Sequence, residues 1–140
     1  MGFIITNPSP VLGNDPNNLP KKMSVTESGV VNVSVIGSLA NLLDSVTATG
    51  AGDPVSTQSY KNFVFEVWGT ATTFSIKMQV VGPSGVARDL KIWDELNNAF
   101  LSGNITTAGV YSVSIPSQMS IQANVISVSG GNVNLEGGML

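Results

Sequence analysis

The sequence NFVFEVWG at residues 62–69 has the clearest strand pattern in the chain. Phe63, Phe65 and Val67 alternate with Glu66 and Trp68, so the apolar and the polar or amphipathic residues fall on opposite faces. Side chains of a β-strand point to opposite sides at every second residue. This stretch therefore predicts a strand with one buried face.

The sequence FSIKMQV at residues 74–80 repeats this alternation, with its apolar residues at every second position. A short turn at residues 69–71 separates the two stretches, which predicts that they pair as a hairpin. The sequence GPSG at residues 82–85 lacks the Lys-Ser/Thr end of a phosphate-binding loop and predicts a turn instead.

Further runs of β-branched and aromatic residues flank this centre, at residues 31–35, 39–49, 111–115, 121–128 and 132–136. Residues 86–98 are ambiguous between a short strand and a turn of helix. Short strands between turns, without a long helical period, predict an all-β fold. We expect a single antiparallel β-sandwich, jelly-roll-like, of about seven to nine strands over residues 23–140.

Residues 1–22 differ from the rest, because they are rich in Asn and Pro and end in Pro20-Lys21-Lys22. Proline removes backbone donors and favours extended geometry before it, which predicts an extended N-terminal arm. Apolar residues are wasteful in a solvated tail, so those of the arm are predicted to bind a partner subunit. They are Phe3, Ile4, Ile5, Val11 and Leu12.

The 140-residue chain is 42% hydrophobic but only 11% charged, against roughly 25% in ordinary soluble domains. Its surface must be polar yet mostly uncharged, as suits burial in an assembly. A net charge of −3 with six Lys and Arg leaves no basic stripe for nucleic acid. The sequence predicts neither a secretory signal nor a stretch long enough to cross a membrane.

The chain contains no Cys and no His. Nucleophilic triads and the common zinc sites need imidazole or thiolate, so we expect no catalytic residue, no cofactor and no resident metal. The carboxylates are scattered, which favours simple solvation. A calcium site at Asp44 or Asp53 remains open, although neither has EF-hand spacing.

Four aromatic residues, Tyr60, Trp68, Trp93 and Tyr111, allow two interpretations. Aromatic rings can stack on sugars, which makes Tyr60, Trp68 and Trp93 candidates for a glycan-binding surface. Core or subunit-interface packing is the commoner role of such residues and is the interpretation that we favour.

One stretch, from Leu43 to Gly137, resembles small β-sandwich virion structural proteins of tailed bacteriophages. The resemblance rests on the pattern F-x-F-x-V at residues 63–67, the strand at residues 74–80, Gly109-Val110-Tyr111 and the Ser129-Gly130-Gly131 turn. In that pattern the last turn closes a final hairpin.

The resemblance implies a capsid decoration, head-fibre or tail-associated protein that acts by adhesion between subunits. Its expected partners are the major capsid or tail protein and further copies of this chain, in a homo-oligomer expected to be a trimer. The expected location is the virion, after synthesis in the host cytoplasm. The alternative is a carbohydrate- or receptor-binding module of a phage adhesion device.

Overall fold

The computed structural model describes residues 12–14, 20–22 and 37–140 of the chain. The chain divides into two units, residues 1–36 and residues 37–140. In the first unit, β1 (Leu12–Asn14) pairs antiparallel with β2 (Pro20–Lys22). The strand predicted at residues 31–35 and the arm residues Phe3, Ile4, Ile5 and Val11 lie outside the described residues.

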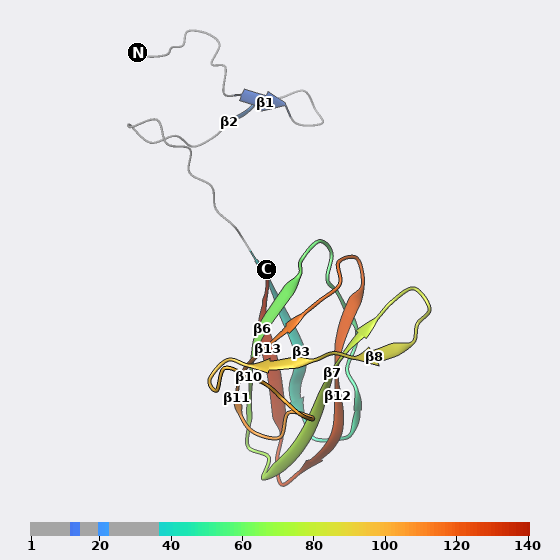
Figure 1. The fold of residues 1–140 in the computed structure, drawn as a ribbon, viewed down its shortest axis with the longest axis vertical. Coiled ribbons are helices and arrows are strands. Elements are labelled where there is room, and N and C mark those ends of the chain that lie inside the picture. Colours follow the sequence, from blue (N-terminus) through green and yellow to red (C-terminus); the bar gives the residue numbers. More distant parts are fainter. Residues whose placement is uncertain (1–11, 15–19, 23–36) are drawn as a thin grey trace. The chain divides into compact units, whose positions relative to one another are not determined.

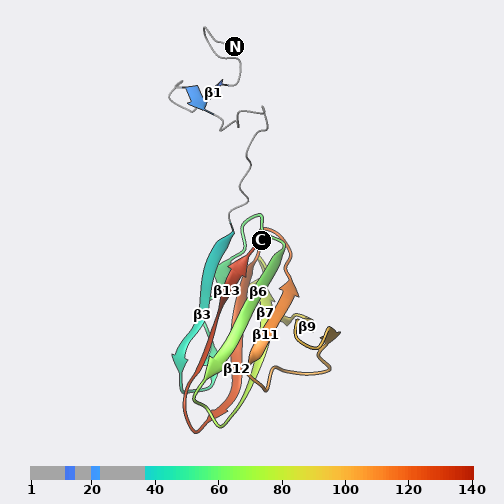
Figure 2. The ribbon, with the colours of Figure 1, turned by 90° about the vertical axis from the view of Figure 1, so that its left-hand side faces the viewer.

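The second unit is a β-sandwich, as predicted, made of two antiparallel sheets (Figure 1). One sheet has six strands in the order β10-β9-β11-β6-β13-β3, and Figure 2 shows its four longest strands side by side. These strands are β3 (Ser38–Val46), β6 (Asn62–Gly69), β9 (Ile92–Asp94), β10 (Ala99–Phe100), β11 (Gly109–Ser114) and β13 (Val133–Met139).

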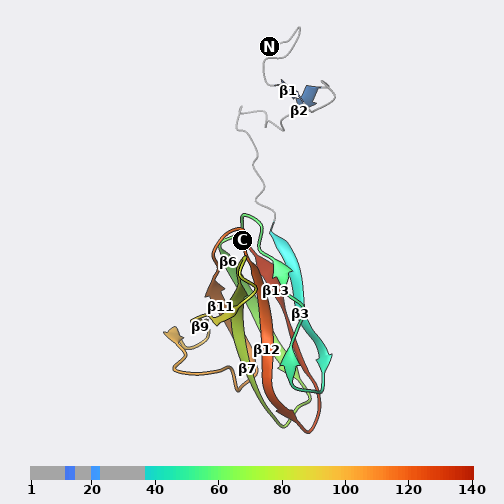
Figure 3. The same ribbon diagram turned by 90° about the vertical axis from the view of Figure 1, so that its right-hand side faces the viewer.

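The other sheet has five strands, with β12 and β7 at its centre (Figure 3). Its strands are β4 (Gly50–Ala51), β5 (Val55–Ser56), β7 (Thr73–Val81), β8 (Ala87–Asp89) and β12 (Ser120–Ser129). The two sheets thus hold more strands than the seven to nine expected, because several two- and three-residue strands are too short to show a period.

The core lies between the sheets and is built from the residues that the alternation predicted to point inward. Phe63, Phe65 and Val67 of β6 are at most 2% exposed, and they face Ile76 and Met78 of β7, which are fully buried. The rings of Phe63 and Phe65 stack with centroids 5.0 Å apart.

No helix in the described part of the chain could cross a membrane.

The predicted hairpin between residues 62–68 and 74–80 is wrong. Strand β6 pairs with β11 and β13, whereas β7 pairs with β12 and β8 in the opposite sheet. Both strands carry a strongly apolar face, and those faces bury most area when they meet across the sandwich rather than lie side by side. Residues 70–72 therefore carry the chain from one sheet to the other.

The final hairpin expected across Ser129-Gly130-Gly131 is also wrong, because β12 and β13 belong to different sheets. The segment between β12 and β13 thus also crosses between the sheets, and it lies against the crossing at residues 70–72. The N–H groups of Thr70 and Ala71 donate to the backbone oxygen of Asn132 at 3.0 and 2.9 Å. The Asn132 N–H in turn donates to Thr70 Oγ1 at 3.1 Å. Each crossing satisfies the backbone groups that the other leaves unpaired.

A third crossing joins β8 to β9 through Leu90 and Lys91 (Figure 1). It follows the turn predicted at Gly82–Gly85, where the Gly85 N–H donates to the oxygen of Gly82 at 2.9 Å. The ambiguous stretch at residues 86–98 thus forms two short strands, one in each sheet, and no helix. This crossing segment separates two grooves.

Candidate functional site

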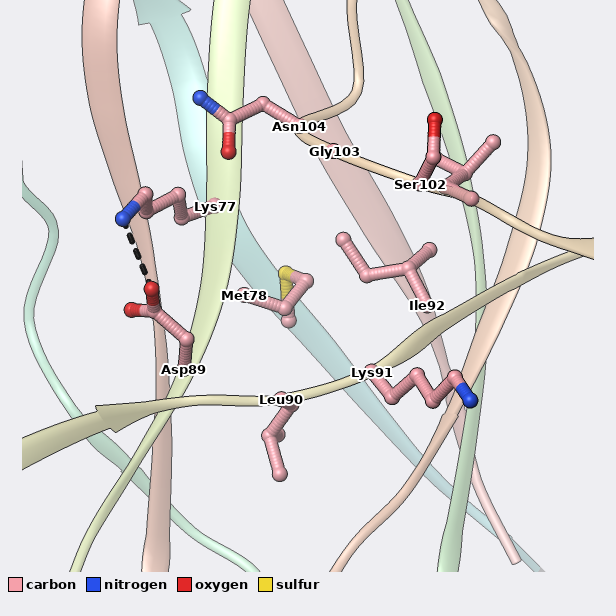
Figure 4. A pocket seen from close by; sticks show the side chains of 10 residues that line it. Lys77, Met78, Asp89, Leu90, Lys91, Ile92, Ser102, Gly103 and Asn104 are labelled. Atoms are coloured by element: carbon pink, nitrogen blue, oxygen red, sulfur yellow. Dashed lines mark hydrogen bonds and ion pairs between the residues drawn. The ribbon is translucent and has the colours of Figure 1, made fainter.

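The first groove has a volume of about 220 Å³ and lies between the crossing segment and residues 101–104. Figure 4 shows Lys77 and Asp89 on one side and Lys91 on the other. Lys77 Nζ donates to Asp89 Oδ2 at 2.7 Å, and Asn104 Nδ2 donates to Ser75 Oγ at 2.8 Å. Lys77, Asp89 and Asn104 of this groove are thus already engaged with partners on the protein.

A ladder of polar side chains extends from this ion pair across the outer face of the five-stranded sheet. Gln79 Nε2 donates to Asp89 Oδ1 at 2.8 Å, and Gln122 Nε2 donates to Gln79 Oε1 at 3.0 Å. Hydrogen bonds from Gln79 and then from Lys77 hold the pKa of Asp89 below its usual value. The ladder explains how uncharged polar residues of an outer face are buried at little cost.

The second groove has a volume of about 480 Å³ and opens on the outer face of the six-stranded sheet. This is within the roughly 300–1,000 Å³ range of small-molecule sites. It is lined by the following residues: Asn62, Leu90, Lys91, Trp93, Phe100, Ser112, Val113 and Ser114.

The strand register explains why this face is hollowed. Two outward residues of β11, Ser112 and Ser114, are small. Ser112 lies opposite Trp93 of β9, and Trp93 lies opposite Phe100 of β10. Two large rings therefore form a wall beside a floor of hydroxyl groups.

The wall of the groove is held together by contacts among its own side chains. The rings of Trp93 and Phe100 meet edge to face with centroids 4.9 Å apart, and Lys91 Nζ lies 4.3 Å from the centre of the Phe100 ring. Such ring pairs and cation–π contacts each contribute about 0.5–1.5 kcal/mol. The wall is therefore formed before any ligand arrives.

The hairpin that carries Phe100 is fixed by Asp94. The N–H groups of Leu96 and Asn97 donate to Asp94 Oδ1 at 2.9 and 3.1 Å, and Asn97 Nδ2 donates to Oδ2 at 2.8 Å. The side-chain bond from Asn97 is the main reason why the pKa of Asp94 lies below its usual value. Asp94 was expected to be merely solvated, but it is 9% exposed and shapes a turn.

The structure separates the four aromatic residues of the glycan hypothesis. Tyr111 is 2% exposed and belongs to the core, and Tyr60 packs against that core. Trp68 is 40% exposed and shares the outer face with Trp93. It is four residues along and two strands across from Trp93, roughly 16 Å by strand geometry. Of the four, Trp93 lines the second groove, together with Phe100, a residue that the sequence pattern does not single out.

The structure adds no support for the other candidate sites, which are a calcium site at Asp44 or Asp53 and the binding residues of the arm. Asp44 and Asp53 are exposed, and the described residues contain no group of three His, Cys, Asp or Glu side chains that could hold a metal. Leu12 begins β1, and the proposed binding role of the arm remains a prediction.

Residues 37–140 thus form a β-sandwich with a groove on one outer face. The XepA family model matches residues 39–139. The chain therefore belongs to the XepA family.

Two solved structures share this fold. The SPBc2 prophage-derived protein YomS superposes with a TM-score of 0.68 at 18% identity, covering 77% of this chain and 98% of YomS. The PBSX exported protein XepA superposes with a TM-score of 0.70 at 17% identity, covering 99% of this chain. This chain spans 49% of that XepA chain. No curated protein gives a significant match to the chain. By name, YomS derives from a prophage and XepA is an exported protein of PBSX.

Proposed function

We propose that this chain is a bacteriophage virion structural protein, a capsid decoration, head-fibre or tail-associated component that works by adhesion between subunits. Its membership of the XepA family and its likeness to a prophage-derived protein support the phage part of this proposal. The adhesive part rests on the edge of the six-stranded sheet.

That edge is strand β3, which has nine residues and pairs, among the described strands, with β13 alone. A long strand with one unpaired side is a template for strand addition by another chain. Soluble proteins commonly guard such an edge with lysine, but β3 contains no Lys or Arg. Leu39 near its start is 83% exposed. The β3 edge is the observation that carries the proposal.

The second adhesive element in the proposal is the arm. Residues 1–22 would dock onto the major capsid or tail protein, while the sandwich associates with further copies of itself into a homo-oligomer. Closed symmetric oligomers repeat one interface, in which the β3 edge of each copy would meet a surface of the next copy. The division of the chain after residue 36 gives the natural truncation point for a test.

The test compares the full chain with residues 37–140 and with residues 23–140, each added to particles that lack the protein. We expect the full chain to bind the particles and both truncated chains to stay folded in solution without binding. Circular dichroism checks the fold. Equal binding by a truncated chain would contradict the role of the arm.

The second groove favours a second candidate function, a carbohydrate- or receptor-binding module of a phage adhesion device. The observation behind it is the Trp93–Phe100 wall beside open polar groups. The two functions are compatible, because the β3 edge and the groove lie at different strands of the same sheet.

A further inference from the structure

We propose that the groove lined by Trp93, Phe100, Ser114 and Asn62 binds a single pyranose residue of a glycan. This inference rests on the second proposed function and is independent of the virion role.

The fold does not need the aromatic wall. The buried core and the partly buried residues that pack against it do not include Trp93 or Phe100. Phe100 is 54% exposed on a two-residue strand at the margin of the sheet. An exposed aromatic ring beside the half-buried ring of Trp93 is typical of a recognition surface rather than of a core.

The polar groups of the floor differ in whether they already have a partner. Ser112 Oγ already donates to Glu95 Oε1. By contrast, the Ser114 hydroxyl and the Asn62 side-chain amide make no hydrogen bond to another described residue, and both side chains line the groove. A hydroxyl and an amide together offer both donors and acceptors.

The groups of the larger groove match the surface of a pyranose. A pyranose has an apolar face of C–H groups and an equatorial rim of hydroxyl groups that both donate and accept. The apolar face of the pyranose can stack on the aromatic wall. Its hydroxyl groups can donate hydrogen bonds to Ser114 and Asn62 and accept hydrogen bonds from them. The register places Ser114 opposite Asn62, so both reach the same end of the ligand.

The smaller groove is less suited to this ligand. Its Lys77, Asp89 and Asn104 are engaged with partners on the protein, and a sugar would have to break those bonds. Lys91 lies between the two grooves and contacts the Phe100 ring. The larger groove therefore has the free groups, the ring surface and the volume.

The experiment uses the fact that the chain has two tryptophans. The full chain is first screened on an array of pyranoside glycans, and a soluble methyl pyranoside of a bound type is then titrated by intrinsic fluorescence. In Trp68→Phe, Trp93 is the sole reporter and its emission should change on binding. In Trp93→Phe, the emission of Trp68 should stay constant.

Affinity is then compared between matched variants. Trp93→Ala should weaken binding by about tenfold or more, which corresponds to about 1.4 kcal/mol, while Trp68→Ala on the same face should leave affinity unchanged. Ser114→Leu fills the groove from an exposed position and should abolish binding without disturbing the wall. It serves as the second test where Trp93→Ala fails to fold.

An array without any bound pyranoside glycan would overturn the proposal, and so would affinity that survives both Trp93→Ala and Ser114→Leu. A change of oligomeric mass in Trp93→Ala, with no glycan bound by the unaltered chain, would assign the groove to a subunit contact instead. None of these results depends on whether the chain joins particles.

Discussion

Gln122 donates from Nε2 to Oε1 of Gln79 at 3.0 Å, across two central strands of the five-stranded sheet. The two side chains are 7% and 9% exposed although they lie on the outer face. Gln79 passes the chain of bonds on to Asp89. A buried amide pair of this kind is stable only while each partner satisfies the other.

Gln122→Ala should therefore lower the free energy of unfolding by about 1–3 kcal/mol, because it leaves a buried Gln79 oxygen unpaired. Asn124→Ala is the matched control, on the same strand and face but with no side-chain hydrogen bond to a described residue. It should change stability by less than about 0.5 kcal/mol. Urea unfolding measures both, and equal losses in the two variants would contradict the ladder.

Glycines 137 and 138 are neighbours in β13 but should respond differently to alanine. A Cβ at Gly137 would overlap the backbone oxygen of Val64, whereas one at Gly138 would meet nothing within 4 Å. Gly137→Ala is expected to cost about 1–3 kcal/mol by overpacking. Gly138→Ala should be within about 0.5 kcal/mol of the unaltered chain. Thermal unfolding checks the pair, and similar melting temperatures would contradict the close approach of β13 to β6.

The hydrogen bonds to Asp94 predict a pH dependence. The pKa of Asp94 is lowered in the fold relative to its ordinary value of 3.8, chiefly by Asn97. Its stabilisation is fully present above that ordinary value and is lost as the pH falls through the lowered folded value. Asp94→Ala should thus lower the melting temperature at pH 7. In strong acid, the melting temperatures of the variant and the unaltered chain should be nearly equal.

The control for this pH prediction is Glu136→Ala, which removes an exposed carboxylate of β13 that accepts no hydrogen bond from a described side chain. The difference between the two variants should shrink as the pH falls below 3.8. A difference that stays constant over the whole range would show that Asp94 acts through packing rather than through its charge.

The β3 edge predicts a specific loss of association. Leu39→Lys places a positive charge at an exposed position of the edge strand, and this should weaken self-association while leaving the fold intact. Val64→Lys makes the same change on β6, an interior strand of the same sheet. It should leave association unchanged.

Sedimentation of the full chain and of both variants measures this effect. We expect an oligomer for the unaltered chain and for Val64→Lys, and a shift toward the monomer for Leu39→Lys. A mass of 14.5 kDa for the unaltered chain would contradict self-association. An equal shift in both variants would place the contact on the face of the sheet rather than on its edge.

Much of this fold could be predicted from residue alternation. The buried faces of β6 and β7 were assigned correctly, because a period of two reports which side chains share a face. The same period does not report which strand lies alongside. Residues 69–72 and 129–132 look like hairpin turns, yet they cross between sheets because their backbone groups pair with each other through Asn132. That relation joins residues about sixty positions apart and leaves no local signal.

The groove was predictable only in part. Trp93 was among the candidates by residue type, but Phe100 and the serines were not. Their meeting depends on the register of three strands, two of which are two or three residues long. A signal did exist in Ser112 and Ser114, whose small outward side chains mark where a sheet face can be hollow.

The central claim is that this protein is part of the virion, and it is tested most directly by fractionating a phage lysate on a density gradient. Quantitative mass spectrometry then measures this chain in the band of intact particles and in the soluble fraction. The account predicts that the chain sediments with the particles in a constant ratio to the major capsid protein and stays there after washing in high salt. Recovery of the chain in the soluble fraction alone would contradict it.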